Sequence, residues 1–513
     1  MGDIKRIKKI VRWTVLVILL LALYPTLTTY NYLKSDRKLR SYIKHTSIPA
    51  IKEQMFGSGA QDMNRSSNMD ELNIEEIQLE VHDTVWTLLQ GDLESRLAAK
   101  SIIASNTNPW RFGVIRYNGS SFDCKIKLRG DTRDNYQYGL ENATFRINLL
   151  GDDLIKGCKK FSLIRPFHEN GLYGMMYYDF SRTRGILSNE FHFVQLRLNE
   201  NDPGVWIFQE AFHTKMLEKQ KQGIGIILKF ENDCTENEGV YNASGFPGLT
   251  AYGKKNISDD SLKNYQYQQA LNNLYGLYRG TVGIDSALDL KLWAEFVAIN
   301  DLFYAHHSMT CHNMRLYFNP STEKIEPVAW DPFSYRFLPY EHPHDYFSGH
   351  MPYISPVYEL LRKDPDFIRS YKRALWELLK DEDLKTYLSE CYALNKTLGP
   401  LLHEPIVTPG LDPSVIEETK RILKNQFFVA HPLTVNAYSK EHELEIINTS
   451  SLPIYCEKLI IGDSEVLIDK VICNTIVVPV NVADNNSIDC SYRSNLSDAM
   501  LIERANIYDL RLP

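Results

Sequence analysis

The hydrophobic pattern changes character twice along this chain of 513 residues. Short strand-like runs dominate up to about residue 230, as in RFGVIRYNGSSFDCKIKL, where Asn118-Gly119 is a hairpin turn signal. Helical spacing dominates from residue 285 to 428, and short alternating runs return after Pro432. This order predicts an α+β domain followed by a separate β-sandwich-like module.

Several segments carry more specific expectations within the first half. IQLEVHDTVWTLL (77–89) alternates in part, which favours a strand, and HFVQLRLNENDPGVWIFQEAF reads as two strands about a polar turn. IGIILKF is typical of a buried, β-branched strand. MMYYDFSRTRGILSNEF and HTKMLEKQKQG favour helices.

An apolar segment near the N-terminus, residues 10–30, carries a single charge at Arg12 and is long enough to cross the ~30 Å hydrocarbon layer. The basic residues before it favour a cytoplasmic N-terminus, although a second basic cluster follows the segment. A cleaved signal peptide is the alternative, but no A-x-A-like site follows the apolar run. We therefore expect a single-pass membrane protein with extracytoplasmic C-terminal domains behind a polar stem, residues 31–75.

The charge balance and the cysteine spacing exclude several classes. With 57 basic and 64 acidic residues, the net charge of -7 argues against a nucleic-acid partner. The eight cysteines contain no CxxC, and a disulfide among Cys456, Cys473 and Cys490 is open if that segment lies in an oxidising compartment. Neither the P-loop pattern nor a G-x-S-x-G elbow occurs.

The stretch CHNMRLYFNPSTEKIEPVAWDP, residues 311–332, reads as two strands joined by NPST. Asn313 precedes the first strand and Asp331 follows the second, so both side chains fall at the open end of the hairpin. In protein kinases an Asn and an Asp placed in this way hold the metal ions, and Mg²⁺ prefers such oxygen ligands. Capping or hydrogen bonding by the same two residues is the alternative.

The longer run NDLFYAHHSMTCHNMRLYFNPSTEKIEPVAWDP resembles the signature segment of the CotH spore-coat kinase family. CKIKLRGDTRDN, KGCKKFSLIRPF, LNENDPGVWIFQEAF and GIILKFEND are similar to other segments of that family, and they occur in the same order. The resemblance covers roughly residues 77–428. It implies an atypical protein-kinase-like fold that binds ATP and Mg²⁺ and transfers phosphate to protein hydroxyls.

The predicted organisation is therefore a cytoplasmic N-terminus (1–9), a transmembrane helix (10–30), a stem (31–75), a CotH-like kinase-fold domain (76–430) and a β-sandwich-like module (431–513).

The resemblance also assigns roles to individual residues. Asn313 and Asp331 match the metal-ligand positions. By analogy with the kinase Lys-Glu pair, Lys229 is the predicted phosphate cation and Glu210 its partner. A solvent-exposed lysine and a glutamate that complements a helix dipole are the alternatives. Arg129 could contact phosphate, or pair with Asp131 or Asp134.

One departure from the family concerns the catalytic base. Members usually carry an Asp a few residues before the metal Asn, whereas HHSMTCH has no carboxylate there. Asp301, twelve residues before Asn313, is one candidate base, and His306 or His307 is another, since imidazole titrates near neutrality. A zinc site is a further alternative, built from His306, His307, Cys311, His312, His342, His344 and His350.

Two functional hypotheses follow. The first is Mg-dependent transfer of a nucleotide γ-phosphate to a surface or envelope protein. The second is a catalytically silent pseudokinase, a scaffold whose tyrosine-rich surface and β module bind envelope protein or polysaccharide.

Overall fold

The computed structural model describes residues 72, 74–98, 108–130, 135–136, 138–169, 171–220, 223–231, 248–253, 257–332, 355–402 and 414–426, together with strands between 433 and 508. All of them fall within one of the two units into which the chain divides, residues 70–403 and 409–513. The predicted transmembrane helix (10–30) and nearly all of the stem lie outside the described residues. No helix within the described residues is both long enough and apolar enough to cross a membrane.

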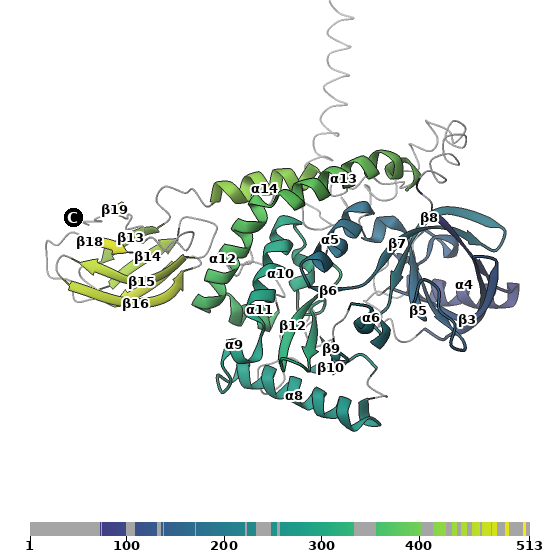
Figure 1. The fold of residues 1–513 in the computed structure, drawn as a ribbon, viewed down its shortest axis with the longest axis horizontal. Coiled ribbons are helices and arrows are strands. Elements are labelled where there is room, and N and C mark those ends of the chain that lie inside the picture. The colour runs from purple at the N-terminus through teal and green to yellow at the C-terminus, as the bar shows by residue number, and fades with distance from the viewer. Residues whose placement is uncertain are drawn as a thin grey trace, which may run out of the picture. The chain divides into compact units, whose positions relative to one another are not determined.

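Seven strands close into a barrel in the order β1-β2-β3-β4-β5-β8-β7 (Figure 1). Neighbouring strands pair antiparallel except β1 and β7, whose parallel pairing closes the barrel. The turn between β2 and β3 is the predicted Asn118-Gly119, with φ of 50° and 74°. The strands are β1 (Glu75–Glu80), β2 (Arg111–Tyr117), β3 (Ser120–Leu128), β4 (Phe145–Leu149), β5 (Lys160–Ile164), β7 (Phe191–Leu198) and β8 (Asn201–Glu210).

The two faces of the barrel strands differ in chemistry. Ile126 and Leu128 on β3 are fully buried, as are Phe145 and Ile147 on β4. Because side chains alternate along a strand, Lys127 and Arg146 point to the opposite, outer face. The inner face therefore forms the core of the barrel, and the outer face carries cations.

The segment 77–89, predicted as a strand, instead divides between a strand and a helix. β1 ends at Glu80, and helix α4 (Asp83–Ala98) begins three residues later. Leu89 and Leu93, four residues apart, are the apolar side chains that α4 buries against the barrel. The partial alternation of the sequence does not continue past Val81. The packing of Leu89 and Leu93 on the barrel then stabilises a helix over the rest of the segment.

A second sheet has the strand order β10-β9-β11-β12-β6 and lies among helices. Its strands are β6 (Leu187–Ser188), β9 (Ile226–Phe230), β10 (Leu249–Ala251), β11 (Arg315–Asn319) and β12 (Lys324–Ala329). The helices are α5 (Leu172–Thr183), α6 (Thr214–Lys219), α8 (Ser261–Tyr278), α9 (Ile284–Ala287), α10 (Leu290–Leu302), α11 (Pro356–Leu361), α12 (Pro365–Lys380), α13 (Glu382–Leu398) and α14 (Ser414–Gln426). Four 3₁₀ turns add η4 (Leu140–Asn142), η5 (Pro166–Glu169), η7 (His306–Met309) and η8 (Gly399–Leu401).

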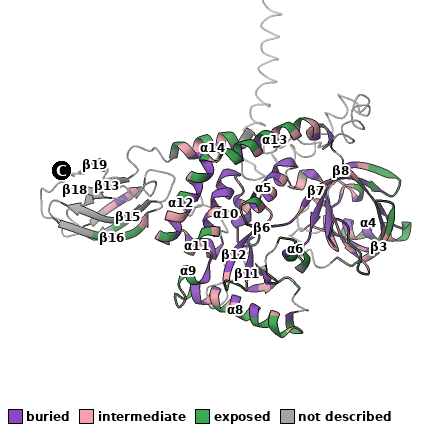
Figure 2. Cartoon of the chain, viewed as in Figure 1, coloured by how far each residue is buried: buried purple, intermediate pink, exposed green. Residues whose placement is uncertain are grey.

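Helix α10 is the buried centre of this helical part (Figure 2). Its last six residues, from Val297 to Leu302, are all at most 1 % exposed. The side-chain carboxylate of Asp289 accepts a hydrogen bond from the Leu292 amide and caps its N-terminus. A rigid α10 fixes the starting point of the segment that leads to η7 and the β11–β12 hairpin.

The C-terminal strands form two sheets, β17-β14-β13-β19 and β16-β15-β18. Their bounds are β13 (Leu433–Tyr438), β14 (Glu443–Asn448), β15 (Ile454–Ile461), β16 (Ser464–Ile472), β17 (Thr475–Pro479), β18 (Ile488–Ser491) and β19 (Asn506–Tyr508). Two sheets of short strands match the content predicted for this segment. Cys456 is buried and is not disulfide-bonded, so the disulfide that the sequence left open does not include it. The mixed helix and strand content of the whole chain confirms the predicted α+β class.

Candidate active site

The predicted hairpin brings Asn313 and Asp331 to one imidazole, that of His307. The Nδ2 atom of Asn313 lies 3.0 Å from the ring nitrogens of His307, and His307 Nδ1 lies 3.8 Å from an Asp331 carboxylate oxygen. The His307 amide donates to the Pro332 carbonyl at 3.2 Å, which ties η7 to the end of the hairpin. Asn313 is buried, whereas 40 % of the Asp331 side chain is exposed. The sequence-predicted metal ligands and His307 therefore form one cluster.

Asp331 is held in an unusual backbone conformation. Its φ of 45° lies in the left-handed region, which costs a non-glycine residue about 1 kcal/mol. Its amide donates to the hydroxyl of Tyr178 at 3.1 Å, which stabilises this conformation. Partial burial raises the pKa of Asp331, but His307 beside it, with smaller effects from His312 and Arg315, leaves the pKa lowered. The carboxylate is therefore ionised at neutral pH, as a metal ligand must be.

A second carboxylate, which the sequence analysis missed, lies close to Asp331. Glu169 at the end of η5 is 3.3 Å from the Tyr178 hydroxyl, the same hydroxyl that contacts the Asp331 amide, and it accepts a hydrogen bond from Gln209 at 3.1 Å. Burial raises the pKa of Glu169 to about 7, Asp331 adds to this, and Arg129 opposes it. A polar residue between Pro166 and the helical run is a weak sequence signal, because only the fold brings it to the hairpin.

The outer face of the barrel contributes cations to the same region. Arg129 follows β3, donates to Gln209 at 2.7 Å and lies over the ring of Trp330, 5.4 Å from its centroid. Arg146 and Lys160 lie beside it on β4 and β5. Burial lowers the pKa of both groups, and a neighbouring arginine adds to this: Arg129 for Arg146, and Arg146 for Lys160, whose pKa falls to about 8. Neither side chain forms an ion pair with another described residue. Crowded cations of this kind are suited to bind an anion.

An aromatic cluster lies beneath these cations. Phe212 contacts both Tyr252 and Trp330, with ring centroids 4.8 Å apart in each pair. Arg315 on β11 lies over the same two rings and donates to the Tyr252 hydroxyl at 2.7 Å. Trp330 directly precedes Asp331, so this cluster connects the barrel to the hairpin end.

The predicted pair of Lys229 and Glu210 is not formed. Glu210 is 2 % exposed and pairs with Lys219 on α6 at 2.8 Å, and Lys219 also contacts Glu190 at 2.9 Å. Lys229 lies on β9 between Thr250 and Arg315 in register, and it makes no ion pair within the described residues. The correction has a structural reason, since α6 begins four residues after β8 ends and brings its own lysine back to the buried carboxylate.

Asp301, the predicted catalytic carboxylate, is fully buried at the end of α10. One of its oxygens lies 3.0 Å from His306 Nε2 and the other accepts from the Tyr371 hydroxyl on α12. Both oxygens are engaged inside the helical core, so Asp301 stabilises the turn that carries His306. Its position gives no support to the predicted catalytic role.

The zinc alternative loses two of its ligands. Cys311 is disulfide-bonded, and His306 is bound to Asp301. His342, His344 and His350 lie outside the described residues. Within the part of the chain that the structure describes, the group with metal-ligand geometry is Cys158, Glu190 and Glu210, and the ammonium of Lys219 already occupies its centre.

The Asn and the Asp at the open end of the hairpin match the arrangement in which protein kinases hold their metal ions. The comparison with protein families agrees: residues 115–403 match the model of the CotH kinase family, described as CotH kinase protein. The match covers more than half of the chain, so the protein belongs to this family. It includes every site residue named above and ends before α14. None of the curated proteins is detectably similar in sequence. A kinase-like function with use of a nucleotide and a metal follows in general terms.

Proposed function

We propose that this protein transfers the γ-phosphate of ATP, with Mg²⁺, to a hydroxyl group of a surface or envelope protein. The observation that carries the proposal is the arrangement of the cluster: Asn313, Asp331 and Glu169 supply oxygen donors, and Arg129, Arg146 and Lys160 supply cations from the outer face of the barrel. Phosphoryl transfer requires this combination, because the protein mainly positions the phosphates and neutralises their charge.

The donor set fits magnesium. Asp331 supplies an ionised, partly exposed carboxylate, and a 180° rotation of the Asn313 amide would present its oxygen in place of Nδ2. Glu169 adds a third oxygen donor when it is ionised. A bound Mg²⁺ would neutralise developing charge on the phosphates. The remaining charge would be met by Arg129, Arg146 and Lys160, which replace the sequence-predicted Lys229 in this role.

His307 is the group placed to act as general base. Its ring is 22 % exposed and lies next to Asp331, whose carboxylate would stabilise the imidazolium. In the proposed step the acceptor oxygen bonds to the γ-phosphorus, the bond from that phosphorus to the bridging oxygen breaks, and the hydroxyl proton passes to His307. ADP leaves with the bridging oxygen.

The acceptor and the compartment are inferred from less direct features. Disulfide-bonded Cys311 is typical of an oxidising compartment, which supports extracytoplasmic placement of the domain. Anchoring through residues 10–30 would hold the domain at the membrane, near envelope proteins.

A pseudokinase scaffold is the second candidate, and one observation favours it. Asp301 is not available as a carboxylate base, because its oxygens are engaged by His306 and Tyr371. Such a protein would bind nucleotide without transfer, and its partners would be envelope protein or polysaccharide.

Nucleotide-dependent thermal shift of the full chain, with and without Mg²⁺, tests the metal–nucleotide site. We expect ATP with Mg²⁺ to raise Tm, and Asp331→Ala to abolish the shift, whereas Asp153→Ala in an exposed turn should retain it. No shift in the native chain would refute nucleotide binding. Transfer of labelled γ-phosphate to envelope proteins, lost in His307→Ala, then separates the kinase from the scaffold.

A further inference from the structure

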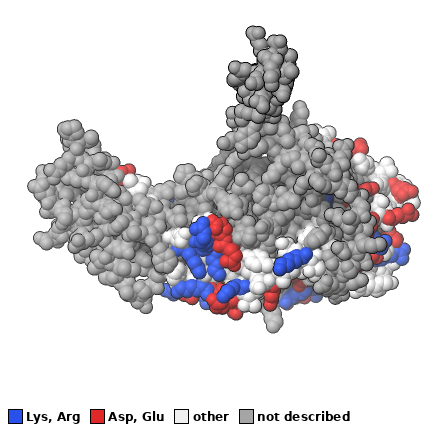
Figure 3. Space-filling model, turned by 90° about the horizontal axis from the view of Figure 1, so that it is seen from above, with Lys and Arg blue, Asp and Glu red and all other residues white. Residues whose placement is uncertain are grey.

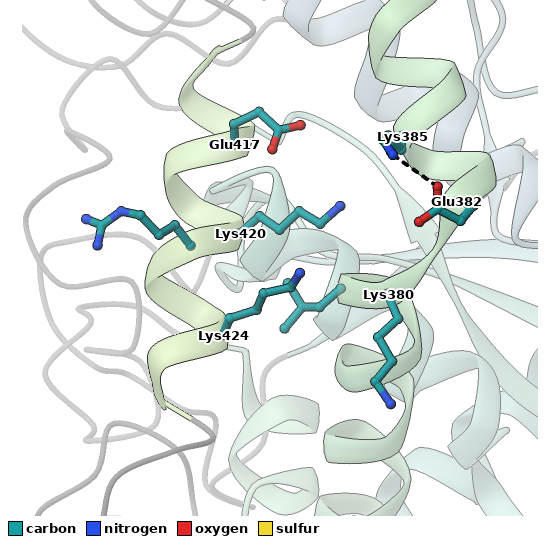
Figure 4. Close-up of a pocket in the computed structure, with 8 residues that line it drawn as sticks. Lys380, Glu382, Lys385, Glu417, Lys420 and Lys424 are labelled. Carbon is teal, nitrogen blue, oxygen red and sulfur yellow. Dashed lines mark hydrogen bonds and ion pairs between the residues drawn. The ribbon is translucent and has the colours of Figure 1, made fainter.

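A groove with a volume of about 640 Å³ lies between α12, α13 and α14 (Figure 4). Its lining residues are separate from those of the candidate active site. Its walls are lined by Leu379, Lys380, Glu382, Lys385, Glu417, Lys420, Arg421 and Lys424. Five of these side chains are cationic and two are anionic. The groove is therefore strongly basic on a chain whose net charge is -7.

Three of the five cations have partners among the described residues. Lys385 pairs with Glu382 at 3.3 Å, Arg421 pairs with Glu418 at 2.5 Å, and the Lys380 ammonium lies over the ring of Trp376, 4.2 Å from its centroid. Lys420 and Lys424 have no ion pair within the described residues. They lie one turn apart on α14, an arrangement of like charges that destabilises a helix by about 0.2–0.5 kcal/mol.

The orientation of these two lysines is set by the packing of α14. A neighbouring stripe of the helix is buried where α14 packs on α10 and α12: Ile416 and Leu423 are fully buried and Thr419 is 2 % exposed. At 3.6 residues per turn, Lys420 and Lys424 border this stripe on one side. Lys420 and Lys424 are themselves only partly exposed, and Figure 4 shows both side chains extending from α14 toward α12 and α13. Their ammonium groups are therefore presented to the groove rather than spread over the surface.

The carboxylates in the groove limit the kind of anion that fits. Glu382 and Glu417 lie among the lysines, so a uniformly charged polymer would meet like charges along its path. In the view from above, Lys and Arg side chains likewise lie beside Asp and Glu side chains (Figure 3). A peptide can place carboxylates opposite Lys420 and Lys424 and neutral residues opposite Glu382 and Glu417.

We infer that this groove binds an acidic peptide segment of a partner protein, with Lys420 and Lys424 as the principal contacts. That the partner is the phosphate acceptor rests on the proposed function. Helix α14 lies beyond the family match at residues 115–403, so the groove depends in part on a segment of this chain that the match does not cover.

The test measures binding of a short fluorescein-labelled peptide of repeating Glu-Ser-Gly to the full chain. Fluorescence anisotropy reports the binding, and no nucleotide is present. We expect the double variant with Lys420→Gln and Lys424→Gln to weaken binding about tenfold, since each exposed charge pair is worth up to about 1 kcal/mol. The matched control, Lys363→Gln with Lys396→Gln, removes the same charge at two exposed positions, one in the turn after α11 and one on α13, and should bind as the native chain does.

Absence of peptide binding, or equal weakening in the control, would overturn the inference. Tighter, Lys420-dependent binding of inorganic polyphosphate than of the peptide would overturn the choice of partner. Because the assay contains no nucleotide, loss of phosphoryl transfer in Asp331→Ala leaves this result unchanged, so failure of the groove and failure of the proposed function are distinguishable.

Discussion

Replacing Lys219 by Met should destabilise the protein strongly at pH 7. The substitution removes the ammonium that lies 2.8 Å from Glu210 and 2.9 Å from Glu190 while keeping the length of the side chain. The side chain of Glu210 is 3 % exposed, so water cannot take the place of the ammonium. Leaving one partner of a buried ion pair alone costs about 3–5 kcal/mol.

Protonation sets an upper limit on this loss. A glutamate with an unfolded-state pKa of about 4.3 can be neutralised at pH 7 for about 3.7 kcal/mol, and this cost falls by about 1.4 kcal/mol for each unit that the pH decreases. We therefore expect Lys219→Met to lose about 3 kcal/mol at pH 7 and about 1 kcal/mol at pH 5.

Glu190 adds a second dependence on pH. Hydrogen bonding to His192, together with Lys219, lowers the pKa of Glu190 to about 2 against the opposing effect of burial. A lowered carboxylate pKa contributes stability above the unfolded pKa, and this stability is lost as the pH falls toward 2. Since Lys219 provides part of it, the variant should show a shallower loss of stability in acid than the native chain.

Urea unfolding of the full chain at pH 7 and pH 5 measures both effects. Lys229→Met is the matched control, because Lys229 makes no ion pair within the described residues, and we expect it to change stability by less than about 1 kcal/mol. The reasoning would be refuted if Lys219→Met were as stable as the native chain at pH 7, or if Lys229→Met were the more damaging variant.

Three further predictions concern the candidate site and its supports. The affinity for Mg²⁺–ATP, measured by calorimetry, should rise as the pH increases through 7, because Glu169, with a pKa of about 7, becomes ionised. Glu169→Gln should flatten this rise, and an equal dependence of affinity on pH in the variant and the native chain would contradict the prediction. Gly174→Ala should cost about 1–3 kcal/mol in urea unfolding, since the new Cβ would lie 2.0 Å from the Glu169 carbonyl oxygen, whereas Gly91→Ala meets no atom within 4 Å and should not destabilise. Tyr371→Phe should cost about 1–3 kcal/mol by leaving an oxygen of buried Asp301 without its donor, and an unchanged midpoint would argue against that hydrogen bond.

Local chemistry made parts of the fold predictable. The Asn118-Gly119 turn, the β7–β8 pair and the β11–β12 hairpin follow from residues that are neighbours in the sequence. The segment 77–89 shows where this reasoning ends. Its alternation is only partial and does not continue past Val81, and the packing of Leu89 and Leu93 on the barrel stabilises the helix that follows β1.

For the candidate site, the sequence by itself determined that Asn313 and Asp331 end one hairpin, because the seventeen residues between them form a strand, a turn and a strand that bring its ends together. Only the tertiary structure determined which other residues lie near them and which charges pair. Glu169, Arg129 and Arg146 come from three other elements, and Lys219 rather than Lys229 pairs with Glu210. The physical reason is that charge pairing depends on distance in space and on burial, and residues far apart in the chain acquire both only when the barrel and the helices have packed.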